Sequence, residues 1–210
     1  MAYPLRRQCG DSQTLDWLPH LLFFKGYIKG KALMTAQKII RVSLTLDEYA
    51  LVEALALARS TKPNSHKFSN HSEYKIHLMG LVAESAFSKI TGIPMQNDIR
   101  PGGDGGQDFQ VGKKIIQLKT RDCNRYPYPD LMVRPSHAKA DYYILSTWSP
   151  TAPQTTAFIG YTNHAELTKS TDNFGYGDRY VCKRKWLGDM QIMLDSIKEY
   201  LTQSNHKGNK

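Results

Sequence analysis

A short series of polar residues between positions 84 and 119 carries the side chains best suited to chemistry. Gln117 and Lys119 lie two residues apart in the segment KIIQLKT, and Asp108 precedes them across a glycine-containing turn. If this segment is a strand, Gln117 and Lys119 leave the same face and Leu118 leaves the other. Glu84 lies upstream in GLVAESAF, beside the apolar face of an expected helix. These four polar groups could therefore converge in one cleft.

That combination of groups suits phosphodiester hydrolysis. Carboxylate and neutral oxygens bind Mg²⁺, which keeps several waters and takes phosphate oxygens as further ligands. The ion lowers the pKa of a bound water and stabilises the negative charge that develops on phosphorus. A neighbouring lysine can hold the attacking water or the scissile phosphate.

Two elements would have to position these residues. Apolar residues at helical spacing predict a helix over 72–90, which Gly92 ends. Residues 108–111 and 114–120 predict a β-hairpin that turns at Gly112 and Lys113. The hairpin would bring Asp108 back toward Gln117, and a helix packed across it would bring Glu84 near Asp108.

The remaining pattern predicts one α/β domain around a mixed sheet. Further strands are expected over 39–46, 141–148, 155–161 and 178–183, and further helices over 47–59, with Thr45 as N-cap, and 190–202. Residues 60–71 and 121–140 are expected to be irregular. The domain would span 34–202, preceded by a basic extension over 1–33 and followed by a disordered tail over 203–210. The extension is either an accessory arm or the translation of sequence upstream of the true start codon.

Composition limits the function. The net charge is +9 and favours a polyanionic partner, since a basic protein gains affinity when phosphates release their counterions. No apolar run approaches the length of a membrane span, so no membrane association is expected. The three cysteines are an odd number without CxxC spacing, which argues against disulfides or a zinc ribbon and favours a reducing, cytoplasmic setting.

The arrangement Glu84, Asp108, Gln117-x-Lys119 resembles the active site of the PD-(D/E)XK nuclease superfamily. The segments GGDGGQDF and IIQLKT are especially similar to the Mrr-like branch of restriction endonucleases, which carries a D-G-G-x-D turn and Q-x-K in place of E-x-K. The resemblance covers roughly residues 72–161. It implies a restriction-endonuclease-like αβββαβ core, a central mixed sheet flanked by helices, dependence on Mg²⁺ with Mn²⁺ as a substitute, and cleavage of DNA.

The resemblance also implies roles for individual residues. Asp108 would be the central metal ligand, Gln117 would occupy the place of the second acidic ligand, and Lys119 would be the catalytic lysine. Glu84 would complete the metal shell, and the role of Asp104 in the turn stays open. Gln117 departs from the majority pattern because an amide oxygen is a weaker, neutral ligand. Substrate phosphates could be bound by Arg121 and Arg125.

Several alternatives remain on the sequence alone. Glu84 could be a solvated helix residue, Asp108 a turn residue, and Lys119 an edge lysine that discourages aggregation. The chain could be a catalytically inactive nucleic-acid-binding module on the same fold, or a structural or interaction protein of a mobile element. The nuclease itself is expected to come from a phage or mobile element. Among nucleases, an endonuclease is favoured over an exonuclease, and a homodimer would suit cleavage of both strands. No separate target-recognition domain is apparent, which favours a structure-directed or nonspecific enzyme.

Overall fold

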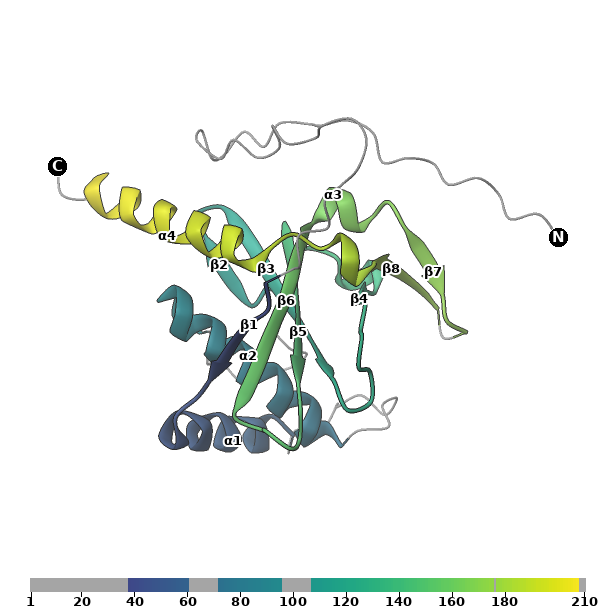
Figure 1. Cartoon of the computed structure of the whole chain (residues 1–210), viewed down its shortest axis with the longest axis horizontal. Helices are drawn as coiled ribbons and strands as arrows, with labels where there is room; N and C mark the ends of the chain where they lie inside the picture. Colours follow the sequence, from purple (N-terminus) through teal and green to yellow (C-terminus); the bar gives the residue numbers. More distant parts are fainter. Residues whose placement is uncertain (1–37, 61–71, 96–106, 176, 208–210) are drawn as a thin grey trace. The chain divides into compact units, whose positions relative to one another are not determined.

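The computed structural model describes residues 38–60, 72–95, 107–175 and 177–207, all within the compact unit Thr35–Lys210 (Figure 1). Three regions discussed above therefore lie outside the described residues. They are the extension over 1–33, most of the loop over 60–71, and the turn that contains Asp104.

A five-stranded mixed sheet forms the centre of the domain. Its strand order is β1-β6-β5-β3-β2, and β3 and β5 are the one parallel pair of neighbours in it. The α/β class with a mixed sheet, predicted from the sequence, is confirmed. The strands are β1 (Ile40–Ser43), β2 (Phe109–Val111), β3 (Lys114–Asp122), β5 (Tyr142–Trp148) and β6 (Thr155–Asn163).

Helices cover one face of this sheet. α1 (Leu46–Ser60) and α2 (Glu73–Thr91) pack against each other, and α4 (Met190–Lys207) contributes to the same first core cluster. A capping box begins α1, since the backbone N–H of Glu48 donates to Thr45 Oγ1 and the N–H of Thr45 donates to the Glu48 carboxylate. Ser72 caps the start of α2, and Gly92, with a φ of 74°, ends it.

A second layer lies against the other face of the sheet, on the side away from α1 and α2 (Figure 1). It contains a small antiparallel sheet in the order β4-β8-β7 and short helical turns. Its apolar side chains join those of β5 and β6 in a second core cluster. The elements are β4 (Leu131–Val133), η1 (Pro135–His137), α3 (His164–Leu167), β7 (Thr171–Asn173), β8 (Asp178–Cys182) and η2 (Arg184–Trp186).

One expectation needs correction, and a second is met only in part. The tail predicted to be disordered from residue 203 continues α4 as far as Lys207, because no glycine or proline interrupts the chain before Gly208. An αβββαβ plan also calls for a helix between the third strand and the strand parallel to it. Residues 123–141, all of them described, instead connect β3 to β5 through β4 and the 3₁₀ turn η1.

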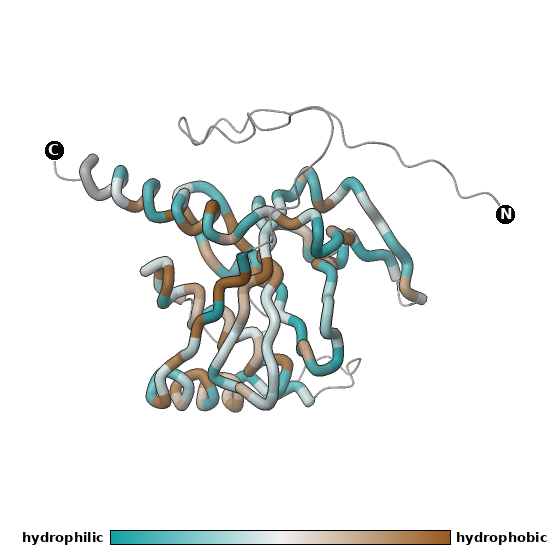
Figure 2. The backbone as a smooth tube through the Cα atoms, in the orientation of Figure 1, coloured by the Kyte–Doolittle hydropathy of each residue, from teal (hydrophilic) through white to brown (hydrophobic). Residues whose placement is uncertain are grey.

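None of the helices in the described ranges is long and apolar enough to span a bilayer. Apolar residues are concentrated where helices and strands meet, whereas the turn after β3 is hydrophilic (Figure 2).

Candidate functional site

The backbone pairing of β2 with β3 ends at Phe109, and Asp108 lies just outside it. Phe109 pairs with Ile116, and Asp108 is the next residue outward on the β2 side. Its carboxylate Oδ2 accepts the backbone N–H of Leu118 at 2.6 Å and so replaces the carbonyl that a longer β2 would offer. Such a short, charge-assisted hydrogen bond fixes the carboxylate at the edge of β3. The fold thus brings Asp108 beside Gln117, as the hairpin pattern predicts.

Gln117 is the most unusual residue of the hairpin. It is 1% exposed, and its Oε1 is the one buried side-chain oxygen or nitrogen without a hydrogen-bond partner among the described residues. A buried amide oxygen that loses water without gaining a partner costs about 1–3 kcal/mol. Buried acceptors of this kind generally have an ordered water or an ion as partner. A neutral oxygen on the residue opposite Asp108 in the hairpin register suits a cation.

Gln117, Lys119 and Arg121 alternate with Ile116 and Leu118 along β3. Ile116 and Leu118 belong to the first core cluster, which contains the side chains of α2. Gln117 and Lys119 therefore face away from α2, toward the layer that holds the second core cluster. Lys119 and Arg121 are half-buried there.

Two contacts establish how α2 runs along β3. Near its N-terminus, Lys75 forms an ion pair with Asp122 at the end of β3. Three turns later, the ring of Phe87 lies 4.8 Å from that of Phe109, the partner of Ile116. From Lys75 to Phe87 a helix advances about 18 Å, and from Asp122 back to Ile116 a strand advances about 20 Å. α2 is therefore antiparallel to β3 and covers it from Asp122 to Ile116.

Glu84 lies between these contacts, about a quarter of the way from Phe87 to Lys75. This position is level with Gln117 and Leu118 on β3, although Glu84 comes from the opposite side of the sheet. The side chain is half-buried and turns back along its own helix, with Oε1 3.8 Å from the position that a Cβ on Gly80 would take. The four predicted residues thus lie at one level of the sheet, but they do not share a face. Asp108 lies one residue beyond the end of β2, opposite Gln117 in the hairpin register, and its carboxylate accepts the Leu118 N–H.

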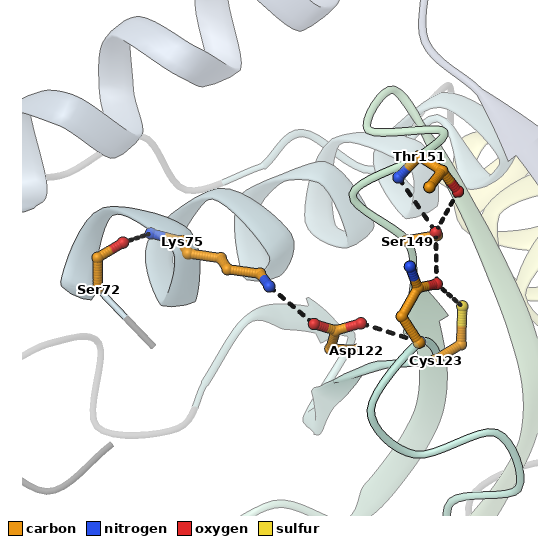
Figure 3. Close-up of polar contacts among 7 residues, drawn as sticks. Ser72, Lys75, Asp122, Cys123, Ser149 and Thr151 are labelled. Atoms are coloured by element: carbon orange, nitrogen blue, oxygen red, sulfur yellow. Dashed lines mark hydrogen bonds and ion pairs between the residues drawn. The ribbon is translucent and has the colours of Figure 1, made fainter. Parts of the chain in front are cut away.

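The ion pair between Lys75 and Asp122 is a polar contact that the sequence analysis missed. Lys75 Nζ lies 2.8 Å from Asp122 Oδ2, and Asp122 is only 4% exposed (Figure 3). Burial opposes ionisation of Asp122, but hydrogen bonds from Lys75 and from the backbone N–H of Asn124 outweigh it, so the pKa of Asp122 lies below its usual value. The ammonium also lies 5.7 Å from the centre of the Trp148 ring. These contacts hold the N-terminal turn of α2 on the end of β3.

The other predicted residues lie farther along the chain. Arg125 is exposed in the turn after β3, with its guanidinium carbon 5.5 Å from the centre of the Tyr126 ring. Among the described residues, no three His, Cys, Asp or Glu side chains lie close enough to hold a metal ion. A cation site in this part of the chain would therefore include neutral oxygens, and the Gln117 amide oxygen is a buried candidate without a partner. A function for this chain has to rest on the geometry of its own residues, since no protein-family model matches the sequence and no curated protein is found to match it.

Proposed function

We propose that the protein is a Mg²⁺-dependent nuclease that hydrolyses phosphodiester bonds of DNA, with Asp108, Gln117 and Lys119 at its centre. The observation that carries the proposal is the buried, unpartnered oxygen of Gln117, a residue that lies opposite Asp108 and its fixed carboxylate in the hairpin register. An endonuclease is favoured over an exonuclease, as the resemblance to restriction endonucleases implies.

The strand arrangement is compatible with a PD-(D/E)XK core. An antiparallel hairpin carries Asp108 on one strand and Gln117 and Lys119 on the next, with a parallel strand beyond and α2 behind. The connection from β3 to β5 lacks the helix of that plan. The proposed membership of the PD-(D/E)XK superfamily therefore rests on the hairpin and on α2. The connection without a helix would be a variation particular to this chain.

The residues present fit a cation. Asp108 and Gln117 would hold it. Glu84 lies on the α2 side of the sheet, so its carboxylate would add negative charge from a distance and would not bind the ion beside Gln117. Bound Mg²⁺ would activate a water and neutralise phosphate charge, and Mn²⁺ could replace it.

The remaining steps belong to side chains of the protein. Lys119 shares a face with Gln117, so its ammonium can orient the attacking water or hold the scissile phosphate. Arg121 continues the same row of β3, and Arg125 is exposed beyond it, so both can bind neighbouring phosphates. The net charge of +9 supports a polyanionic substrate.

The test is incubation of the purified protein with supercoiled and linear DNA in Mg²⁺, Mn²⁺ or EDTA. We expect metal-dependent nicking of the circle, which Lys119→Ala abolishes without loss of DNA binding. Lys113→Ala is the matched control because this exposed lysine lies in the turn of the same hairpin. Asp108→Asn is preferable to Asp108→Ala, since the amide oxygen can still accept the Leu118 N–H while the charge is removed. Undiminished cleavage by Lys119→Ala would refute the assignment.

One observation favours a second candidate. Gln117 is neutral, and no cluster of three acidic or metal-binding side chains occurs among the described residues. An inactive nucleic-acid-binding module would retain the basic surface without binding a metal. In that case the protein binds DNA with strong salt dependence and cleaves none in either metal.

A further inference from the structure

Asp130 joins two surface segments that lie far apart in the sequence. Its carboxylate accepts the backbone N–H of Arg184 and also binds Lys183 Nζ, each at 2.9 Å. The strands that follow and precede these segments pair with each other, with Leu131 opposite Cys182. The loop after β3 and the turn η2 are therefore fixed side by side.

Large aromatic side chains are exposed on both segments. In the loop after β3, Tyr128 is 84% exposed, and Tyr126 precedes it by two residues. On η2, Trp186 is 61% exposed. Prolines follow both tyrosines, and a proline restricts the residue before it to extended conformations. Tyr128 is therefore held outward by a stiff backbone, at little further cost in conformational entropy when a ligand binds. Aromatic rings of this size usually bury most of their surface, so their exposure here needs a reason.

A cation accompanies each of these rings. The guanidinium carbon of Arg184 lies 5.9 Å from the centre of the Tyr128 ring and so links the two segments. Lys185 Nζ lies 5.5 Å from the Trp186 ring, and Arg125 lies beside Tyr126. Within the described ranges, no carboxylate forms an ion pair with any of these three cations. Their charge is available to an external anion.

Rings and unpaired cations in alternation are the features by which proteins bind single-stranded nucleic acid. Bases stack on the aromatic side chains, and basic groups contact the phosphates between them. Bases in a duplex are already stacked on one another and cannot use such rings. We propose that this aromatic surface binds the unpaired bases of single-stranded DNA; its residues are Arg125, Tyr126, Tyr128, Arg184, Lys185 and Trp186.

The aromatic surface begins close to the candidate site. Lys119 lies on β3 about 10 Å before Asp122. The turn that leads to Tyr126 starts after Asp122, where β3 ends. The second layer, which carries η2, packs on the face of the sheet that Gln117 and Lys119 share. The substrate class is therefore DNA with an unpaired segment within a few nucleotides of the scissile bond. This inference rests on the proposed function in taking DNA as the partner.

The experiment measures binding in EDTA, so that cleavage plays no part. The full chain is titrated into fluorescein-labelled oligo(dT) of about 12 nucleotides and, separately, into a duplex of the same length, with anisotropy as the readout. We expect Trp186→Ala and Tyr128→Ala each to weaken binding to oligo(dT) by about 5- to 150-fold and binding to the duplex by less than about twofold. Trp186→Phe should retain most of the affinity because phenylalanine still presents an aromatic face.

Two controls separate stacking from other effects. Phe174→Ala removes another exposed aromatic ring beyond the opposite end of β8, and should leave oligo(dT) binding unchanged. Lys185→Ala should weaken binding to both forms of DNA and reduce the salt dependence on oligo(dT) by about 0.7 in log–log slope.

The result can be told apart from the outcome of the nuclease assay. Selective loss of oligo(dT) affinity supports the stacking surface even if the protein cleaves nothing in Mg²⁺. Unchanged oligo(dT) affinity in Trp186→Ala and Tyr128→Ala overturns it, even if the protein cleaves DNA. Equal losses on oligo(dT) and duplex also overturn it, since stacking on unpaired bases would then not be the cause.

Discussion

The lone buried oxygen of Gln117 makes a quantitative prediction about stability. Methionine has a similar length and no polar oxygen, so Gln117→Met removes the unpaired acceptor while filling nearly the same space. An unpaired buried amide oxygen costs about 1–3 kcal/mol, and part of that gain is lost through imperfect packing. We therefore expect Gln117→Met to raise the free energy of unfolding in EDTA by about 1–2 kcal/mol. For a domain of this size that corresponds to an increase in Tm of about 3–6 °C.

Magnesium should cancel most of the stability difference between the two proteins. A site with a Kd on the order of 1 mM gains about 1.4 kcal/mol in about 10 mM Mg²⁺, if only the folded state binds the ion. The wild-type protein should show this gain, and Gln117→Met should show little of it. The assay is urea denaturation followed by circular dichroism, in EDTA and in Mg²⁺, with thermal unfolding as a second readout.

Gln110→Met is the matched control. Gln110 is exposed on the neighbouring strand, and its Nε2 donates to the carbonyl of Gly112 at 2.8 Å. Its replacement should change stability by less than about 0.5 kcal/mol and leave the Mg²⁺ response intact. If Gln117→Met is less stable than wild type in EDTA and responds equally to Mg²⁺, then Oε1 is neither unpaired nor a ligand.

Three further predictions concern Gln117, the ion pair between Lys75 and Asp122, and the capping box of α1. Gln117→Glu should be less stable than wild type in EDTA, because it buries a second carboxylate beside Asp108, and should bind Mg²⁺ about tenfold more tightly by titration calorimetry. Weaker Mg²⁺ binding by this variant would exclude position 117 from the cation site. Lys75→Met should lower the free energy of unfolding at pH 7 by about 2–3 kcal/mol, because it leaves the buried Asp122 unpaired. The pKa of Asp122 is depressed in the folded state, so the ion pair stabilises the fold fully above the unfolded pKa of about 3.9, and this stabilisation is lost as the pH falls through the lower folded pKa. Urea titrations at pH 7 and pH 3 should show that the difference in unfolding free energy between wild type and Lys75→Met shrinks in acid. A constant difference would contradict the ion pair. Thr45→Ala should cost about 1 kcal/mol by removing one half of the capping box, with DNA cleavage unchanged.

Local patterns sufficed for the long elements. The cap at Ser72 and the glycine at 92 mark the two ends of α2, and the hairpin turn at Gly112 has the positive φ of 59° that its pattern calls for. Gly112 has a second constraint that no pattern reveals, because a Cβ there would collide with the hydroxyl of Tyr200 on α4.

In the second layer the sequence predicted β8, but the shorter elements escaped prediction for a physical reason. β4, β7 and α3 are three or four residues long, too short for any periodicity to develop. Their conformation depends on tertiary pairing, as between Met132 and Val181, which are distant in the sequence. The aromatic surface depends on the same pairing, so the sequence alone could not bring the tyrosines of the loop together with Arg184 and Lys185.

The two faces of β3 could not be assigned from the hairpin alone either. Alternation places Gln117 and Lys119 on one face, but it does not say which face α2 covers. That choice follows from the contacts of Lys75 and Phe87, which come from long-range packing.

The hydrogen bond from Leu118 to Asp108 has a spectroscopic consequence. The amide proton of Leu118 points at a titratable carboxylate, whereas ordinary sheet amides point at carbonyl groups. Protonation of that carboxylate, or a cation drawn to it, would polarise this N–H group differently and shift its ¹H and ¹⁵N resonances. One backbone signal could thus follow the charge state of Asp108 in the unmodified protein, without DNA and without turnover.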